Sequence, residues 1–123
     1  LTVNALTAAD GVIIPVAAEF FALRGVALLM QSIEKVQHRI NPDLQVFGVL
    51  VTMFTRTLHS EEVLQRIYEA FQGRVLHSVI SRSIKLPDST VAAVPITIFA
   101  PEHKTAKEYR EVARELISNG VVE

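Results

Sequence analysis

The 123-residue chain contains no cysteine and no tryptophan. Without cysteine it can form no disulfide, no thiolate metal site and no cysteine nucleophile. Its five glycines are scattered, at positions 11, 25, 48, 73 and 120. Neither glycine-rich phosphate-binding loop, G-x-x-x-x-G-K-[ST] or G-x-G-x-x-G, is therefore present, and the sequence has no recognisable cradle for a triphosphate.

Long apolar runs and an excess of charge are also lacking. The most apolar segment, FFALRGVALLM, is interrupted by Arg24 and falls short of the roughly 18 apolar residues that span a bilayer. No charged segment or cleavage pattern at Leu1 supports a signal peptide. The net charge is -1, so any contact with an anionic polymer has to come from a local basic patch.

Apolar runs alternate with helical periodicity along the chain. Continuous β-branched runs predict buried strands at residues 11–16, 46–54 and 74–81. Apolar residues at three- and four-residue steps predict helices at residues 19–40, 60–73 and 105–118, after a helix-prone run at the start. We expect an irregular polar segment at 81–93 and a short strand at 94–99.

Three local features refine these helices. The first has a predicted buried stripe formed by Leu23, Val26, Met30, Ile33, Val36 and Ile40. Ser60 is the predicted N-cap of the second helix. Thr105 and Glu108 have the spacing of a capping box for the third.

The alternation of strands and helices predicts an α/β fold, a three-layer sandwich with a mostly parallel sheet of Rossmann or P-loop type. We see no linker or repeat, so residues 1–123 are expected to form one unit. Three strands make a thin version of this fold, because a doubly wound sheet normally has five or more. The abrupt start at Leu1 leads us to expect further strands upstream.

Three cations lie in loops at the predicted carboxyl ends of the strands. Arg56 follows the second strand, whereas Arg82 and Lys85 follow the third. Ligands of parallel α/β sheets gather at this edge, and a small basic patch there suits phosphates or a nucleic-acid backbone. The alternative is that all three are ordinary solvated loop residues.

Other polar residues have structural interpretations beside functional ones. Glu19 follows the first strand and either positions a water, pairs with a cation or occupies the first helical turn. The four histidines show no i, i+3 or i, i+4 pairing, so no metal site is expected. His77-Ser78 lacks the G-x-S-x-G elbow of a nucleophile. Thr52, Thr55 and Thr57, at and after the end of the second strand, suit a phosphate or the amides of a turn.

The ordered segments LTVNALTAADGVIIPV, EFFALRGVALL, FGVLVTMFTRT, VISRSIKLPDS and KEYREVARELI resemble the carboxy-terminal half of the ParA/Soj family of partitioning ATPases. The similarity runs from Leu1 to about Gly120. It implies a deviant P-loop fold whose phosphate-gripping lysines and catalytic carboxylates lie in the other half. ATP and Mg would therefore bind the intact protein, and this part alone should not hydrolyse ATP.

The resemblance also implies a function. Members form ATP-dependent dimers that bind DNA without sequence preference, in the cytoplasm on the nucleoid, and a ParB-like partner stimulates hydrolysis. Arg56, Lys85 and Arg82 match their basic DNA-binding positions. Ser81, Arg82 and Ser83 match the side of the site that packs against adenine.

The sequence departs from the family pattern at several of these positions. A proline is usual at Ser81, an arginine at Lys85 and a small acidic residue at Thr55. The loop around Arg56 is one residue shorter, and Pro87-Asp88-Ser89-Thr90-Val91 replaces the usual serine-glutamate-alanine-proline-serine segment. These departures affect the adenine side and the partner contacts more than the fold.

Three other classes of protein are alternatives. A MinD-like positioning ATPase would need an amphipathic membrane helix, which the tail ISNGVVE does not provide. A receiver-type signalling domain would need several acidic residues at strand ends, where only Glu19 is found. A non-catalytic α/β binding or assembly module remains open, and it predicts self-association through an unpaired edge of the sheet.

Overall fold

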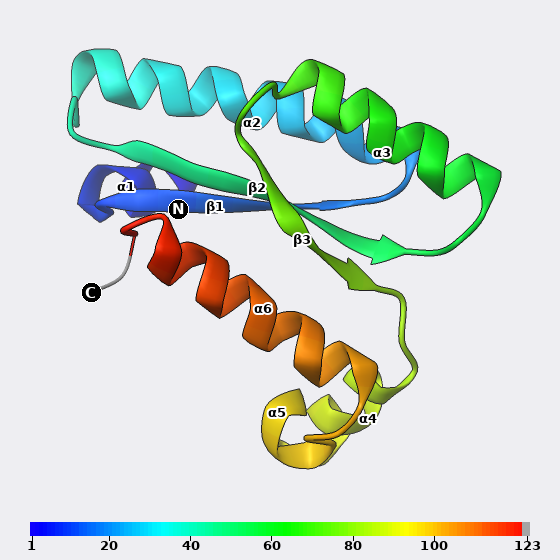
Figure 1. The fold of residues 1–123 in the computed structure, drawn as a ribbon. Helices are drawn as coiled ribbons and strands as arrows, with labels where there is room; N and C mark the ends of the chain where they lie inside the picture. The colour runs from blue at the N-terminus through cyan, green and yellow to red at the C-terminus, as the bar shows by residue number, and fades with distance from the viewer. Residues whose placement is uncertain (122–123) are drawn as a thin grey trace.

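The computed structural model describes residues 1–121, apart from the side chains of residues 20–22. Three strands alternate with helices along the chain (Figure 1). Their order is α1 (Thr2–Ala8), β1 (Gly11–Ala17), α2 (Phe20–Arg39), β2 (Gln45–Phe54), α3 (Leu58–Ala70), β3 (Val75–Ser81), α4 (Lys85–Val91), α5 (Ile96–Phe99) and α6 (Lys104–Ser118).

The strands form one parallel sheet in the order β1-β2-β3. Backbone bonds continue to its carboxyl edge, where Ala18 donates to Thr52 and Arg82 donates to Phe54, each over 3.0 Å. The predicted α/β class and parallel sheet are therefore confirmed. Because the strands end together, the loops that follow them share one edge.

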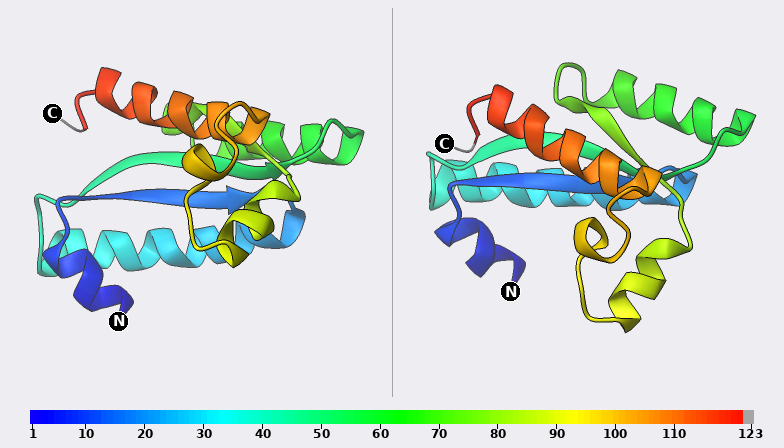
Figure 2. Two further views of the ribbon diagram at one scale, coloured as in Figure 1. Left: turned by 90° about the horizontal axis from the view of Figure 1, so that it is seen from below. Right: turned by 60° about the horizontal axis from the view of Figure 1, so that its bottom comes forward.

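Helices cover both faces of the sheet. In Figure 1, α2 and α3 lie above the sheet and α6 lies below it, and Figure 2 shows the same sheet between α2 and α6. The larger core packs α2 and α3 onto the strands through buried residues that include Ile14, Ile33, Val51, Val63 and Ile67. A smaller core, Leu50, Leu76, Ile80 and Val112, joins α6 to the opposite face.

Several local predictions are wrong. The segment expected to be irregular contains α4, and the expected strand at 94–99 contains the short helix α5. Pro95 precedes α5 with φ -65°, a value that suits entry into a helix. Ile40 lies just after α2 and is 53% exposed, so it is not part of the buried stripe.

Two predicted caps are also wrong. Thr57 is the N-cap of α3, and its hydroxyl accepts the N–H of Ser60 over 3.1 Å. His103 caps α6, because its Nδ1 accepts the N–H of Thr105 over 3.1 Å. Glu108 is instead bonded to Ser81, so it takes no part in a capping box.

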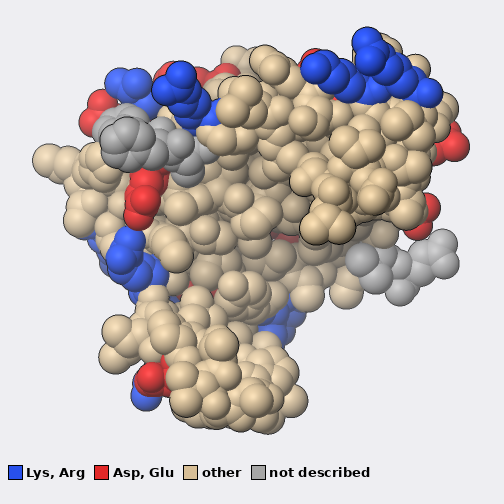
Figure 3. Space-filling model, turned by 180° about the vertical axis from the view of Figure 1, so that it is seen from behind, with Lys and Arg blue, Asp and Glu red and all other residues tan. Residues whose placement is uncertain are grey.

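The surface is unevenly charged. Figure 3, seen from the side opposite Figure 1, shows a broad uncharged area in the middle of this face, with Lys and Arg side chains mainly around its margin. Among the described residues, no helix is long and apolar enough to cross a bilayer. The same residues contain no cluster of three or more His, Asp or Glu arranged to hold a metal ion.

Candidate functional site at the carboxyl edge of the sheet

Two of the predicted cations line the same cavity at the carboxyl edge. Arg56 and Arg82 lie around a space of about 480 Å³ between the ends of β2 and β3. Lys104, from the first turn of α6, lines it with them. Lys85 is not among its lining residues. It begins α4, and its N–H donates to the Ser83 hydroxyl over 3.1 Å.

An ion pair crosses this edge from β3 to β1. The guanidinium of Arg82 lies 3.3 Å from a carboxylate oxygen of Glu19, and the two side chains are 61% and 53% exposed. Pairing with a cation, one of the three interpretations of Glu19, is therefore observed, and Glu19 is also the N-cap residue of α2. Because both groups remain largely in water, the pair contributes little to stability and leaves Arg82 open to competing anions.

Met53 shows backbone strain at the end of β2. Its φ is +53°, in the left-handed region that a residue with a Cβ seldom adopts. Its side chain is 51% exposed and lines cavities on either side of the strand end. Strained residues of this kind cluster at binding sites, so Met53 joins the candidate site.

A second cavity adjoins the predicted adenine side. It has a volume of about 610 Å³, and Ser81, Arg82 and Ser83 line it together with Met53 and Tyr109. Most of its remaining lining is apolar. This combination of apolar walls with a few polar groups is typical of small-molecule sites.

The threonines after β2 have mainly structural partners. The Thr55 hydroxyl lies 2.8 Å from that of Ser60 and 3.3 Å from that of Thr57. Thr57 also caps α3. These contacts favour the interpretation that Thr55 and Thr57 stabilise the turn.

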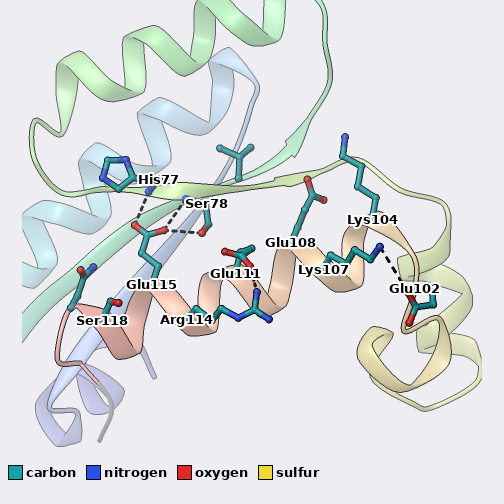
Figure 4. Close-up of a pocket in the computed structure, with 12 residues that line it drawn as sticks. His77, Ser78, Glu102, Lys104, Lys107, Glu108, Glu111, Arg114, Glu115 and Ser118 are labelled. Carbon is teal, nitrogen blue, oxygen red and sulfur yellow. Dashed lines mark hydrogen bonds and ion pairs between the residues drawn. The ribbon is translucent and has the colours of Figure 1, made fainter.

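Two carboxylates of α6 hold the edge strand β3 in place (Figure 4). Glu108 accepts the N–H and hydroxyl of Ser81 over 3.1 and 2.7 Å. Glu115 accepts the N–H of His77 over 2.7 Å and both donors of Ser78 over 2.8 Å. The first bond set holds the start of the loop that carries Arg82. The sequence did not predict the contacts of Glu108 or Glu115, because no local pattern signals contacts between residues so far apart in the chain.

The environment of Glu115 perturbs its ionisation. Burial raises the pKa of its carboxyl group, but the hydrogen bonds from His77 and Ser78 outweigh burial and hold the pKa below the usual value. Glu115 is therefore held as a carboxylate. Because Ser78 donates its hydroxyl to this carboxylate, the structural interpretation of His77-Ser78 is the one that fits.

The parallel sheet and its flanking helices match part of a P-loop NTPase-type α/β fold. A family model described as "AAA domain" matches residues 1–46. A solved structure named cobyrinic acid a,c-diamide synthase, from Mycobacterium smegmatis, aligns with a TM-score of 0.72 and 35% identity, over 93% of this chain and 40% of that one. Further structures with that name hold ADP with magnesium and an ATP analogue with magnesium.

Sequence relatives identify the family. An uncharacterised protein of Mycobacterium tuberculosis is 48% identical over 95% of this chain and 37% of its own length. The chromosome-partitioning ATPase Soj of Thermus thermophilus is 40% identical over 96% of this chain and 48% of its own. The chain belongs to the ParA/Soj family, as its sequence pattern predicted, and it spans less than half the length of these relatives.

Proposed function

We propose that this chain is part of a chromosome- or plasmid-partitioning ATPase that binds DNA without sequence preference as an ATP-dependent dimer. The proposal rests on the finding that Arg56 and Arg82 line one cavity. The chain is also similar to a chromosome-partitioning ATPase. Such cations neutralise backbone phosphates whatever the base sequence.

The DNA-binding residues are Arg56, Arg82 and Lys85. Among the described residues, Arg56 and Lys85 have no ion-pair partner, so their charges are available to a polyanion. The net charge of -1 confines the attraction to this local patch. Lys85 would reach the polymer from outside the cavity that the two arginines share.

ATP and Mg are the proposed cofactors of the intact protein. The cavity lined by Ser81, Arg82 and Ser83 supports an adenine-side role for these residues, because it is mainly apolar and large enough for a planar base. This chain carries no phosphate-gripping loop of its own. Hydrolysis therefore depends on residues outside it.

The partners are DNA, a ParB-like protein and a second copy of the ATPase, and the location is the cytoplasm on the nucleoid. Self-association of the chain itself is favoured by β1, which pairs with β2 on one side only. An α/β assembly module without catalysis would share this feature. The two hypotheses differ in whether the protein binds ATP and DNA.

The test is a salt series of DNA binding by the full-length protein with an ATP analogue bound. Replacing Arg56 and Lys85 together by Ala should make the negative slope of log K against log salt shallower by about 1.8, since each phosphate contact contributes about 0.9 to its magnitude. Replacing Lys35 and Arg39, near the end of α2, by Ala is the charge-matched control. An unchanged affinity and slope for the Arg56/Lys85 variant would remove the DNA role of these residues.

A further inference from the structure

The cavity between the ends of β2 and β3 contains a cation that lies far from both strands in the sequence. Lys104 begins α6, and α6 packs against β3 with its first turn beside the end of that strand. Figure 4 shows the Lys104 side chain extending toward the end of β3, whereas Lys107 points to Glu102. Lys104 thereby joins Arg56 and Arg82, and we name this space the three-cation cavity.

The balance of charge in the three-cation cavity favours an anion. Three cationic side chains face one carboxylate, that of Glu108. That carboxylate already accepts the N–H and hydroxyl of Ser81, over 3.1 and 2.7 Å. Among the described residues neither Arg56 nor Lys104 has an ion-pair partner. Two of the three cations are thus free to meet a ligand.

We propose that the three-cation cavity binds a phosphate of a polynucleotide backbone and that Lys104 is one of its binding residues. This inference rests on the proposed DNA-binding function and adds to it a site and a residue. Lysine suits this task, because its ammonium is a mobile point charge that needs no fixed geometry at a phosphate.

The same phosphate chemistry could come from a bound nucleotide. Two observations favour the polymer. Lys104 and Arg82 are exposed, so the cavity opens to a ligand lying along the surface. The mainly apolar space suited to a base is the neighbouring cavity, which Met53 and Tyr109 line and which neither Lys104 nor Arg56 lines.

Glu19 modulates the same site. Its carboxylate holds Arg82 at 3.3 Å, so a phosphate must compete with it for the guanidinium. Removing this charge by Glu19→Gln should strengthen DNA binding. Glu34→Gln changes the same charge further along α2, where Glu34 is exposed, and it should leave binding unchanged.

The experiment measures binding of a fluorescent DNA duplex, across a salt series, to the full-length protein saturated with an ATP analogue. Lys104→Ala should weaken binding roughly eightfold at 0.1 M salt and make the negative slope of log K against log salt shallower by about 0.9, the contribution of one phosphate contact. Lys107→Ala removes the same charge one turn later, from a residue paired with Glu102, and should change neither. Lys104→Arg should restore most of the affinity.

Each outcome has a defined meaning. Lys104→Ala could behave as Lys107→Ala while the Arg56/Lys85 double variant loses affinity for DNA. In that case the assignment of Lys104 as a phosphate-binding residue is wrong and the proposed function stands. If Lys104→Ala weakens binding of a fluorescent ATP analogue and not of DNA, the phosphate belongs to the nucleotide and the inference is overturned. If the unaltered protein binds no DNA, both proposals fall. Thermal melting of each variant checks that the exposed substitutions leave the fold intact.

Discussion

The carboxylate of Glu115 accepts both the N–H and the hydroxyl of Ser78, each over 2.8 Å. It also accepts the N–H of His77. This contact lies where the pairing of β3 with β2 is irregular, since the register shifts between the pairs Val49–Val75 and Val51–Val79. Proteins often cover the unpaired groups of an edge strand. In this protein, a side chain of α6 does so for β3.

Glu115→Gln should destabilise the protein by about 1–3 kcal/mol, the usual loss when charged hydrogen bonds are removed. The amide has the same shape, but it carries no charge and only its oxygen can accept. Glu111→Gln is the control, because among the described residues Glu111 pairs only with Arg114, on the exposed side of α6. Urea unfolding of both variants measures the difference. Equal stabilities would contradict a special role for Glu115.

The same carboxylate predicts a pH dependence. Because the folded-state pKa of Glu115 is lowered, its contribution to stability is present above the unfolded pKa, about 4.3. It is lost as the pH falls below that value and through the lower folded pKa. The stability difference between the unaltered protein and Glu115→Gln should therefore be full at neutral pH and shrink in acid. A difference that stays constant down to pH 3 would oppose this explanation.

Much of the fold follows from local pattern. The β-branched runs predict the three strands to within one residue, and the periodic stripes predict α2 and α6 equally well. The errors in element type lie at 81–99, where short apolar stretches fit a strand or a helical turn equally well and tertiary packing decides. Ser60 was a plausible cap, but Thr57, three residues earlier, has the extended backbone that a cap requires.

The site was only partly predictable. Parallel strands place Arg56 and Arg82 on one edge, and the sequence therefore predicts their proximity. Lys104 could not be found in this way, because its place depends on the direction in which α6 packs back across β3. The bonds of Glu108 and Glu115 depend on the same packing. Contacts between distant segments need the assembled fold.

Thr57→Ala should destabilise α3 by about 1 kcal/mol. The Thr57 hydroxyl accepts the Ser60 N–H over 3.1 Å, and loss of such an N-cap leaves an N–H of the first turn without its acceptor. Thr57→Ser keeps the oxygen and should retain most of the stability. Thermal unfolding of the two variants tests the assignment, which fails if serine is as harmful as alanine.

Two glycine substitutions should act in opposite directions. A Cβ at Gly48 in β2 would lie 2.7 Å from a methyl carbon of the buried Leu76, so Gly48→Ala should cost about 1–3 kcal/mol through overpacking. A Cβ at Gly25 in α2 meets nothing within 4 Å. Gly25→Ala should stabilise the helix by about 1 kcal/mol. Chemical denaturation of both variants decides, and a gain at Gly48 would show that Leu76 can move aside.

The outer edge of β1 should drive association between chains. Among the described residues this strand pairs with β2 alone, and its residue Ile13 is 37% exposed. Unpaired strand edges with apolar neighbours favour association between chains. The isolated 123-residue chain should therefore sediment as larger species when its concentration rises.

Ile13→Lys should reverse this association, because a charge beside a strand edge opposes edge pairing. Leu58→Lys is the control, since Leu58 begins α3 and is already 85% exposed. Sedimentation velocity over a concentration series compares the three proteins. A stable monomer at high concentration would show that the edge of β1 does not drive assembly. Equal suppression by both lysines would assign the effect to added charge in general, because Ile13 belongs to the edge strand β1 and Leu58 belongs to α3.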